Sequence, residues 1–397
     1  MAPLPILTFS TLYPNDQQPN HGIFVENRLR HLVASGEVAA RVVAPVPWFP
    51  SGAAAFGSWA AYARTARRET RHDLEVYHPR YPVIPKLGMA FAPWLLYRAT
   101  LPVLRRLCET HGRPAAIDAH YVYPDGVAAT WLGSRLGLPV VITARGTDVS
   151  LIPRYAIPRR MIQQAIRDAA ALIAVSGAIK QALVALGAPA DKVTVLRNGV
   201  EADLFRPPDD RPTVRAALGL TGPTLISVGL LIERKGHHRV IEAMAALPGH
   251  TLLIVGEGPE RARLAGMVER LGLADRVRLL GARPHAELPA LYGAADALVL
   301  ASSREGWANV LLEAMACGTP VIASNIWGNP EVVRSPAAGL ITESNTAEGI
   351  VAAARRMFAD PPDRAATRAY AEQFSWDETT AGQLALFMRV VDRSSDQ

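Results

Sequence analysis

The sequence is poor in cysteine and contains no long apolar segment. It has two cysteines, Cys108 and Cys317, so neither a disulfide framework nor a cysteine-based zinc site is expected, and a reducing compartment is indicated. A membrane-spanning helix needs about 20 apolar residues, and the nearest candidate, residues 87–107, is interrupted by prolines and arginines. The first ten residues lack the basic and apolar regions of a signal peptide. These absences predict a cytoplasmic protein.

Two short motifs are also missing. No Asp-x-Asp pair occurs anywhere in the chain, so we expect no required divalent metal ion. No Gly-x-Gly-x-x-Gly fingerprint follows a predicted strand; the nearest match, residues 256–259, lacks the third glycine. This absence argues against a nicotinamide-dependent dehydrogenase, and no cofactor is expected.

Charge is unevenly distributed along the 397 residues. Residues 1–200 contain 22 Lys and Arg against 12 Asp and Glu, whereas the remainder contains 20 against 24. A basic half can attract nucleic acid, an anionic membrane surface or an acidic substrate. No zinc-finger, basic-zipper or aromatic RNA-binding pattern is present, so nucleic acid is not an expected partner.

Short β-branched segments alternate with longer helical patterns along the whole chain. Eleven apolar segments predict strands: Ile6–Phe9, Ala40–Val46, Ile117–His120, Val140–Thr143, Leu172–Val175, Val193–Leu196, Thr224–Val228, Thr251–Val255, Val277–Leu280, Ala297–Leu300 and Val321–Ala323. Continuous apolar strands are typical of parallel sheets buried on both faces. We therefore expect two doubly wound α/β domains, with the boundary near the proline-rich segment 206–212.

Two carboxylates flank the start of a predicted helix near the end of the second domain. Glu305 lies just before the helix and Glu313 inside it; eight residues at about 100° each bring the second acid to within about 80° of the first. The helix N-terminus, near Asn309, carries partial positive charge and unpaired N–H groups that favour a diphosphate. Carboxylates beside such an anion are useful when they bind neutral hydroxyl groups, as in a sugar or ribose.

A basic pair follows the first predicted strand of the second domain. Arg234 and Lys235 lie on a loop that begins at Gly229 and ends at Gly236. Fixed cations at a strand end could neutralise the charge that develops on a diphosphate leaving group. The simpler alternative is a basic pair that only faces solvent.

Three residues of the first half stand where ligands of open α/β sheets bind, beyond the carboxyl ends of strands. Gly22 precedes a predicted helix and could let a phosphate or sugar approach the backbone. His120 ends one strand, and Arg145 follows the next strand. A turn glycine and a structural histidine remain the alternatives for the first two.

The segment from Glu305 to Pro320 resembles the Glu-x7-Glu motif of the family 4 retaining glycosyltransferases, including its Glu-Ala-Met-Ala-x-Gly-x-Pro tail. Residues 229–236 resemble the Gly-Arg-x4-Lys-Gly segment of that family. Lys235 matches the family lysine, whereas Leu230 stands where the family has arginine, and Arg234 is a candidate substitute.

Two segments of the first half resemble the same family. Residues 143–148 are similar to its Thr-x-His-Gly-x-Asp segment, with Arg145 in place of histidine. Such an arginine would favour an anionic acceptor or the donor phosphate. The loop at residues 20–27 resembles that of enzymes that build surface polysaccharides of the teichuronic-acid type.

The resemblance implies a GT-B fold, with two Rossmann-like domains facing each other across a cleft. Residues 1–200 would bind the acceptor and residues 201–373 the nucleotide sugar, while residues 374–397 would form a helix that crosses back to the first domain. The implied catalytic residues are Glu305, His120 and Lys235. The implied contacts of the nucleotide sugar are Arg234, Lys235, Glu313, Asn309, Gly306, Trp307, Gly22, Arg145 and Arg283. In this scheme Glu305 binds the transferred sugar, Glu313 binds the ribose, and the leaving phosphate acts as the base.

The expected reaction is transfer from a nucleotide sugar, most commonly a UDP-sugar in the family, to a glycan or lipid-linked acceptor in cell-surface polysaccharide synthesis. The arginine-punctuated stretch 81–107, together with the basic first half, suggests a lipid-linked, anionic acceptor and peripheral contact with the inner membrane; core helices with exposed arginines explain the stretch equally well. A basic helical face is also expected at residues 64–71, and a solvated face is the favoured interpretation of it. A sugar epimerase or a phosphorylase on the same scaffold is an alternative, and a phosphorylase would need free phosphate or bound pyridoxal. A non-catalytic sugar-nucleotide-binding protein is another, and it would bind without releasing product.

Overall fold

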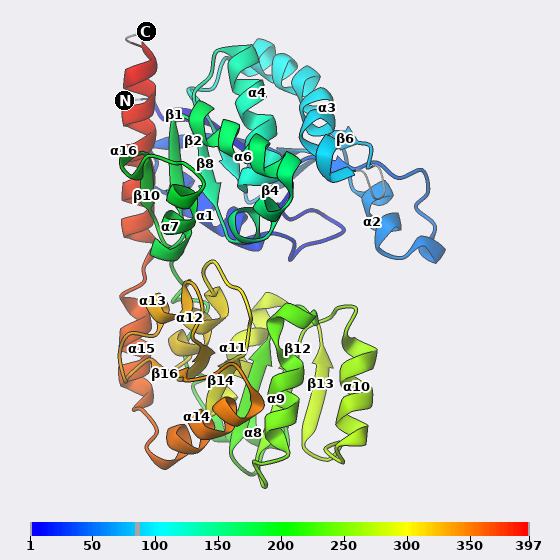
Figure 1. The fold of residues 1–397 in the computed structure, drawn as a ribbon, viewed down its shortest axis with the longest axis vertical. Helices are drawn as coiled ribbons and strands as arrows, with labels where there is room; N and C mark the ends of the chain where they lie inside the picture. Colours follow the sequence, from blue (N-terminus) through cyan, green and yellow to red (C-terminus); the bar gives the residue numbers. More distant parts are fainter. Residues whose placement is uncertain (1, 84–87, 396–397) are drawn as a thin grey trace. The chain divides into compact units, whose positions relative to one another are not determined.

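The computed structural model describes residues 2–83 and 88–395 and divides the chain into two compact units (Figure 1). The first unit comprises Met1–Arg197 together with Asp377–Gln397, and the second comprises Asn198–Trp376. The boundaries expected from the sequence, residues 201 and 374, each lie three positions away. Residues 198–200 belong to the second unit because Val200 donates its backbone N–H to the carbonyl of Phe374 at 2.9 Å.

The first unit is built on an eight-stranded sheet. Its strands are β1 (Leu4–Phe9), β2 (Val38–Val43), β4 (Arg68–Arg71), β5 (Leu74–Tyr77), β7 (Ala116–His120), β8 (Val140–Ala144), β9 (Ala171–Ala174) and β10 (Val193–Val195). The order is β10-β9-β8-β7-β1-β2-β5-β4, parallel throughout except for the antiparallel pair of β4 and β5. A separate parallel pair is formed by β3 (Val46–Pro47) and β6 (Arg80–Tyr81).

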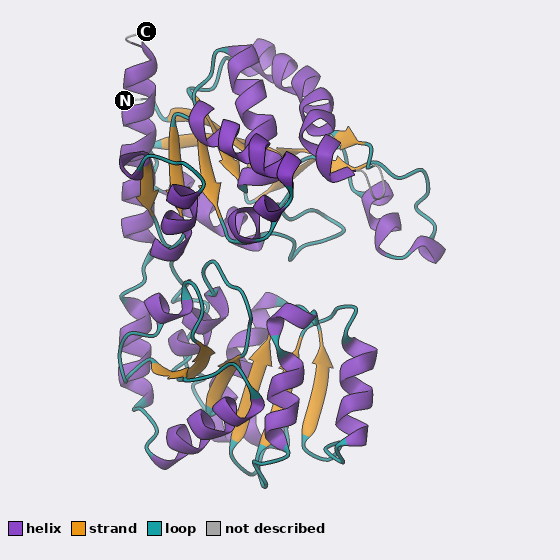
Figure 2. Cartoon of the chain, viewed as in Figure 1, coloured by secondary structure: helices purple, strands orange, loops and turns teal. Residues whose placement is uncertain are grey.

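Helices cover this sheet (Figure 2). They are α1 (Ile23–Ala34), α2 (Ser58–Arg64), α3 (Gly88–His111), α4 (Val127–Leu136), α5 (Thr147–Ser150), α6 (Ala156–Asp168), α7 (Gly177–Ala185) and α16 (Trp376–Ser395). Helices α3, α4 and α6 pack on one another, whereas α1 and α16 share a core with the strands that includes Leu29, Val42 and Phe387. Every residue of β7 and β8 is buried, as expected for parallel strands covered on both faces.

The second unit contains a six-stranded, entirely parallel sheet. Its strands are β11 (Thr224–Val228), β12 (Thr251–Val255), β13 (Val277–Gly281), β14 (Ala297–Leu300), β15 (Val321–Ser324) and β16 (Gly339–Thr342). The order is β13-β12-β11-β14-β15-β16, which is the arrangement of dinucleotide-binding Rossmann sheets. The order reverses between β11 and β14, so this point is where a ligand site is expected.

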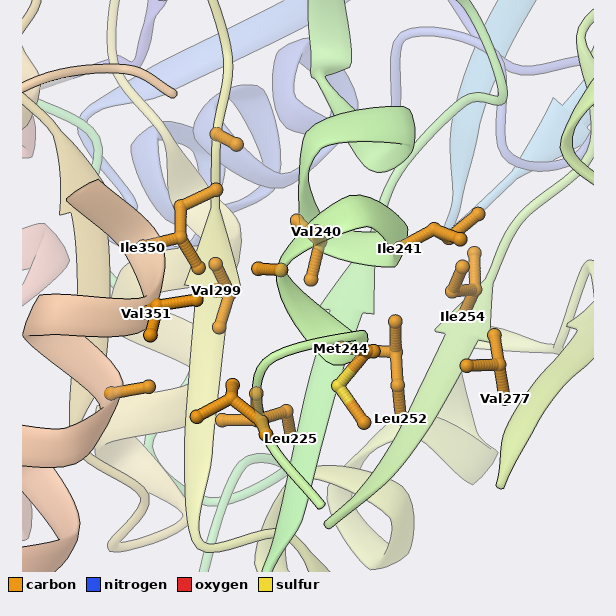
Figure 3. Close-up of a cluster of buried hydrophobic side chains, with 14 of the residues drawn as sticks. Leu225, Val240, Ile241, Met244, Leu252, Ile254, Val277, Val299, Ile350 and Val351 are labelled. Carbon is orange, nitrogen blue, oxygen red and sulfur yellow. The ribbon is translucent and has the colours of Figure 1, made fainter. Parts of the chain in front are cut away.

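Eight helices are assigned in the described part of the second unit: α8 (Arg211–Ala217), α9 (His237–Met244), α10 (Arg261–Arg270), α11 (Leu288–Ala294), α12 (Asn309–Ala316), α13 (Asn329–Val332), α14 (Ala347–Ala359) and α15 (Arg364–Glu372). Figure 3 shows side chains of α9 and α14 against the strands: Val240, Ile241 and Met244 come from α9, Ile350 and Val351 from α14, and Leu225, Leu252, Ile254, Val277 and Val299 from the sheet. This core holds β11 and β14 rigidly side by side.

The basic helical face expected at residues 64–71 is wrong. Helix α2 ends at Arg64, and the chain then forms the β4–β5 hairpin, in which Arg71 pairs with Leu74. His72 and Asp73 have φ angles of 47° and 63°. Two consecutive positive φ values are typical of a tight type I′ hairpin turn, and this local signal was not recognised in the sequence.

None of the helices in the described ranges combines the length and apolarity needed to cross a bilayer. Within the stretch 81–107, residues 84–87 lie outside the described part of the chain, and the remainder forms the end of β6, a short loop and α3.

Candidate functional site

The switch point of the second sheet brings two loops together. Residues 229–236 connect β11 to α9, and residues 301–308 connect β14 to α12. Because β11 and β14 are neighbouring parallel strands, both loops leave the same edge of the sheet. The topology therefore joins the two segments that carry the basic pair and the first acid.

Lys235 and Glu305 form a close ion pair at this edge. The Lys235 ammonium lies 2.6 Å from Oε1 of Glu305, and the hydroxyl of Ser302 donates to the same oxygen at 2.7 Å. The side chains are 14% and 9% exposed, so the pair is mostly buried but reachable from solvent. Within the described residues, Oε2 of Glu305 has no hydrogen-bond partner, which leaves one carboxylate oxygen for a ligand hydroxyl.

Gly236 allows the two loops to approach each other. Its φ is 74°, and a Cβ at this position would lie 2.0 Å from the carbonyl oxygen of Ala301. Only glycine tolerates this combination without strain. The backbone N–H of Ser303 donates to the carbonyl of Arg234 at 2.8 Å, and Nη1 of Arg234 donates to the carbonyl of Arg304 at 3.3 Å. Arg234 is thereby held beside the Lys235–Glu305 pair.

Helix α12 begins at Asn309 without a side-chain cap, so its first N–H groups remain available to an anion. Oδ1 of Asn309 accepts a hydrogen bond from Nδ2 of Asn198 at 3.1 Å. Trp307 differs from expectation: it is buried, donates its indole N–H to the carbonyl of Asn198 at 3.1 Å, and packs on Phe374. Gly306, also buried, precedes it. Trp307 therefore supports the loop from behind rather than presenting its ring to a ligand.

Glu313 lies inside α12 and has partners different from those of Glu305. Its Oε2 accepts the hydroxyl proton of Tyr292 at 2.8 Å, and its Oε1 lies 3.9 Å from Nε2 of His285. Burial lowers the pKa of His285, but the hydrogen bond and charge of Glu313 outweigh this effect and the pKa is raised. The ring of His285 also packs edge-on against Phe205 at 4.9 Å. The carboxylate is thus fixed on the helix that starts at the switch point.

His237 was not singled out in the sequence, yet it is the first residue of α9 and follows the Lys235 loop. It is buried, and the hydroxyl of Ser227 lies 2.9 Å from its Nδ1. Burial, together with the nearby charge of Lys235, lowers the pKa of His237 to about 4. A neutral ring at this place leaves the positive charge of the loop to Arg234 and Lys235.

Two other sequence candidates lie apart from the ion pair. Arg283 follows β13 and makes a 3.6 Å ion pair with Glu287 in which both side chains are well exposed. Leu230, which stands at the arginine position of the resembled motif, is 59% exposed. The structure thus contains no cation at that position, and Arg234 is the nearest alternative on the same loop.

The first sheet has its own switch point, between β1 and β7. Gly22 ends the loop that follows β1 and precedes α1; its φ is 70°, and a Cβ would lie 2.3 Å from the carbonyl oxygen of Leu12. Gly22 is therefore required by the loop geometry itself.

The same loop is bound by a buried acid. Asp125 accepts hydrogen bonds from the backbone N–H and hydroxyl of Thr11 at 3.2 and 2.9 Å. Burial raises the pKa of Asp125 to about 8, against the effect of these two bonds.

His120 ends β7 and is buried with both ring nitrogens engaged. Nη2 of Arg145 donates to Nδ1 at 2.8 Å, and Nε2 lies 3.1 Å from Oδ2 of Asp118. Because arginine can only donate, Nδ1 must accept and the ring proton sits on Nε2. Burial lowers the pKa of His120, which agrees with a neutral ring. In this arrangement His120 holds Arg145 in position, and its expected catalytic role stays a prediction.

Arg145 is the charged residue of this site. Its guanidinium lies 4.8 Å from the ring centre of Phe24, and burial lowers its pKa to about 9, which leaves it protonated at neutral pH. Gln383 of α16 extends this network of hydrogen bonds. Its Nε2 donates to Oδ2 of Asp118 at 3.2 Å, and its Oε1 accepts from Nε of Arg28 at 2.9 Å. The C-terminal helix therefore takes part in positioning Arg145.

Among the described residues, no group of three His, Cys, Asp or Glu side chains could hold a metal ion.

The sequence missed Ser302, His237, Asp118 and Gln383, which support the charged residues. Ser302 lies two residues after the predicted strand Ala297–Leu300, and that position was the available signal. Asp118 and Gln383 are 265 positions apart, so no local pattern could have joined them.

Family profiles match most of the chain. The profile described as glycosyl transferases group 1 matches residues 210–374, and that described as glycosyltransferase family 4 matches residues 60–204. A D-inositol 3-phosphate glycosyltransferase of Segniliparus rotundus is 32% identical over 323 residues, which are 74% of this chain and 71% of the relative. The Mycobacterium tuberculosis protein of the same name is 33% identical over 301 residues, 69% of this chain and 62% of the relative.

Solved structures show the same architecture. A sucrose-phosphate synthase from Thermosynechococcus elongatus superposes with a TM-score of 0.79 at 22% identity and covers 98% of this chain and all of its own. Anabaena HepE in complex with UDP-glucose gives a TM-score of 0.73 at 21% identity, over 99% of this chain and all of its own. These two similarities concern the fold.

The sequence motifs, the two parallel-sheet α/β domains and the relatives agree. The chain is therefore a glycosyltransferase that belongs to family 4 and has the GT-B fold.

Proposed function

We propose that this glycosyltransferase takes a UDP-sugar as donor and transfers the sugar, with retention of configuration, to a glycan or lipid-linked acceptor that carries an anionic group. The observation that carries the proposal is the Lys235–Glu305 pair at the switch point of the second sheet. Synthesis of a cell-surface polysaccharide at the cytoplasmic side of the membrane is the role that this chemistry would serve.

The donor assignment rests on complementary charge. Lys235, Arg234 and the uncapped start of α12 offer cationic and N–H groups to a diphosphate, while Glu305 keeps one oxygen for a sugar hydroxyl. Glu313 is held by Tyr292, and it would bind the ribose hydroxyls. The structure of HepE was solved with UDP-glucose, which supports a UDP-sugar as the donor class.

Catalysis would rest on stabilising the leaving group. As the bond between the anomeric carbon and the diphosphate oxygen breaks, negative charge grows on UDP, and fixed cations lower the energy of that state. The acceptor oxygen then bonds to the same face of the sugar, and its proton passes to the departing phosphate. In this scheme neither His120 nor another side chain accepts that proton, in keeping with the occupied nitrogens of His120.

The acceptor assignment rests on Arg145. The Arg145 guanidinium stays protonated at neutral pH, and a guanidinium matches phosphate and carboxylate geometry. The relatives from Segniliparus and Mycobacterium are named for D-inositol 3-phosphate, a phosphate-bearing compound. A phosphorylated or carboxylated acceptor is therefore the class to test first.

The test is a panel of UDP-, ADP- and GDP-sugars, each incubated with the protein and with neutral, phosphorylated and lipid-linked acceptors. Release of UDP and a glycosylated product whose anomeric configuration matches that of the donor supports the proposal. Inverted product, or preference for a neutral acceptor over its phosphorylated analogue, contradicts the corresponding part.

A further inference from the structure

Exposed large apolar side chains gather in one part of the first unit. Thirteen such side chains are exposed among the described residues, and seven of them lie between positions 48 and 94: Trp48, Phe56, Trp59, Val83, Met89, Phe91 and Trp94. Trp48 and Trp94 are 55% and 51% exposed. Single exposed apolar residues are ordinary, but a group that includes three tryptophans and two phenylalanines marks an interaction site.

The fold places these residues on adjoining elements. Trp48 follows β3 and donates its backbone N–H to the carbonyl of Tyr81 in β6 at 2.7 Å, and α3 packs against β6. Figure 1 shows α2 and the start of α3 near β6 in the first unit. Phe49 joins the group, with ring centres 5.3 Å from Phe56 and 5.6 Å from Trp59. The aromatic residues therefore belong to one surface rather than to scattered sites.

Arginines continue the same surface along α3. Phe91, Trp94, Arg98 and Arg105 are exposed and follow one another at spacings of three, four and seven residues, so they share a face of the helix. The guanidinium of Arg98 lies 5.8 Å from the ring centre of Trp94. Further along, a groove of about 680 Å³ is lined by three arginines, Arg98, Arg105 and Arg106, and by one acid, Glu109, among others. The face is apolar at its start and basic in its middle.

Acidic residues are missing from this region of the chain. There is no Asp or Glu between Glu37 and Glu69 or between Glu75 and Glu109, although nine arginines and lysines lie in these two intervals. A surface that is aromatic and predominantly cationic complements an anionic lipid bilayer, where rings sit among the headgroups and arginines meet phosphates. A second copy of this surface would bring like charges together and is disfavoured.

We propose that the surface formed by α2, the β3–β6 pair and the exposed face of α3 as far as Arg105 docks on an anionic lipid bilayer. This proposal deepens the proposed function and rests on it in one respect, because docking would present the enzyme to a lipid-linked acceptor. Below, these elements are called the docking surface.

The first experiment is co-sedimentation of the full chain with vesicles. Vesicles of equal parts phosphatidylcholine and phosphatidylglycerol should bind the protein, and vesicles of phosphatidylcholine alone should bind it much more weakly. The double variant Phe91→Ser with Trp94→Ser should lose at least about tenfold in vesicle affinity. Val184→Ser with Leu271→Ser is the matched control, since both residues are exposed apolar side chains away from the docking surface; it should bind like the wild type.

The second experiment tests charge. Arg98→Gln and Arg105→Gln should each weaken binding to the anionic vesicles about fivefold, and raised salt should do the same. Equal binding to neutral vesicles, or unchanged binding of the double serine variant, would overturn the proposal. Sedimentation equilibrium without lipid tests whether a second copy of the chain occupies the docking surface instead. A dimer that the double serine variant abolishes would assign the surface to a second copy and overturn the proposal.

Failure here is separable from failure of the proposed function. UDP release from a UDP-sugar in the absence of lipid needs no residue of the docking surface, and the double serine variant should leave it unchanged. If the wild-type chain releases UDP but does not bind anionic vesicles, only docking is refuted, whereas vesicle binding without any sugar transfer would refute the proposed reaction only.

Discussion

The ion pair between Lys235 and Glu305 leads to a quantitative prediction, because the two residues should act on different parts of the donor. At a separation of 2.6 Å and an effective dielectric constant of about 20, their attraction is on the order of 6 kcal/mol. Desolvation of two largely buried groups cancels most of this attraction, and a net coupling of about 1–3 kcal/mol is expected for residues in contact. Lys235 is therefore partly neutralised by Glu305 before any donor binds.

Single substitutions should separate the two roles. Lys235→Met removes a charge-assisted hydrogen bond to the diphosphate, worth about 1.5–3 kcal/mol, so affinity for UDP should fall roughly 10- to 150-fold. Glu305→Gln frees Lys235, so UDP should bind as well as to the wild type or a few-fold more tightly. Sugar transfer by Glu305→Gln should nevertheless fall by about tenfold or more, because an amide accepts the sugar hydroxyl less strongly than a carboxylate does.

Calorimetric titration measures the affinity for UDP, and a UDP-release assay measures sugar transfer. Glu372→Gln is a suitable control, since it removes an ion pair with Arg368 in α15 and should change neither value. Thermal unfolding of each variant confirms that it folds. If Glu305→Gln loses as much UDP affinity as Lys235→Met, the pair is only structural and the division of roles is refuted.

Three further predictions concern groups outside the ion pair. His120→Gln keeps a hydrogen-bond acceptor for Arg145 and should retain most activity. His120→Ala removes it and should raise the KM for the acceptor substrate roughly tenfold. Equal losses of activity in the two variants would indicate proton transfer by His120. The pKa of Asp125 is raised from 3.8 to about 8 by burial, so its stabilising contribution is complete below pH 3.8 and lost as the pH rises through about 8. Asp125→Asn should flatten this decline in thermal unfolding, and identical pH profiles would contradict the assignment. The pKa of His285 is raised from 6.5 by Glu313 despite burial, so its contribution is complete below pH 6.5 and lost above that pH. His285→Gln should therefore lower the Tm more at about pH 5.5 than at about pH 8.5, and the opposite order would refute the pairing.

Much of the second unit could be predicted from the sequence because its signals are local. All five apolar segments predicted there are strands, and each is followed by a loop and a helix. The strand β16 was missed, since Gly339–Thr342 is short and begins with glycine. Lys235 and Glu305 could be placed at one site because both follow strands, and only the strand order, which is not a local property, was needed to bring them together.

The first unit shows where this reasoning stops. A histidine at a strand end looks the same in sequence whether its nitrogens face a ligand or other side chains. The role of His120 depends on Asp118, two residues earlier, and on Arg145, on the next strand. It also depends on Gln383, which α16 brings back to this unit from the far end of the chain. Such long-range hydrogen bonds decide protonation, and no periodicity encodes them.

The pairing of Lys235 in the free protein has a chemical consequence for donor binding. The ammonium of Lys235 is paired with the carboxylate of Glu305. A diphosphate must therefore compete with Glu305 for Lys235, and the carboxylate that it displaces is the one proposed to bind the sugar. Diphosphate binding would thus release Glu305 for the sugar hydroxyls at the moment the donor arrives. Binding of UDP alone should therefore be the step at which the Lys235–Glu305 pair opens.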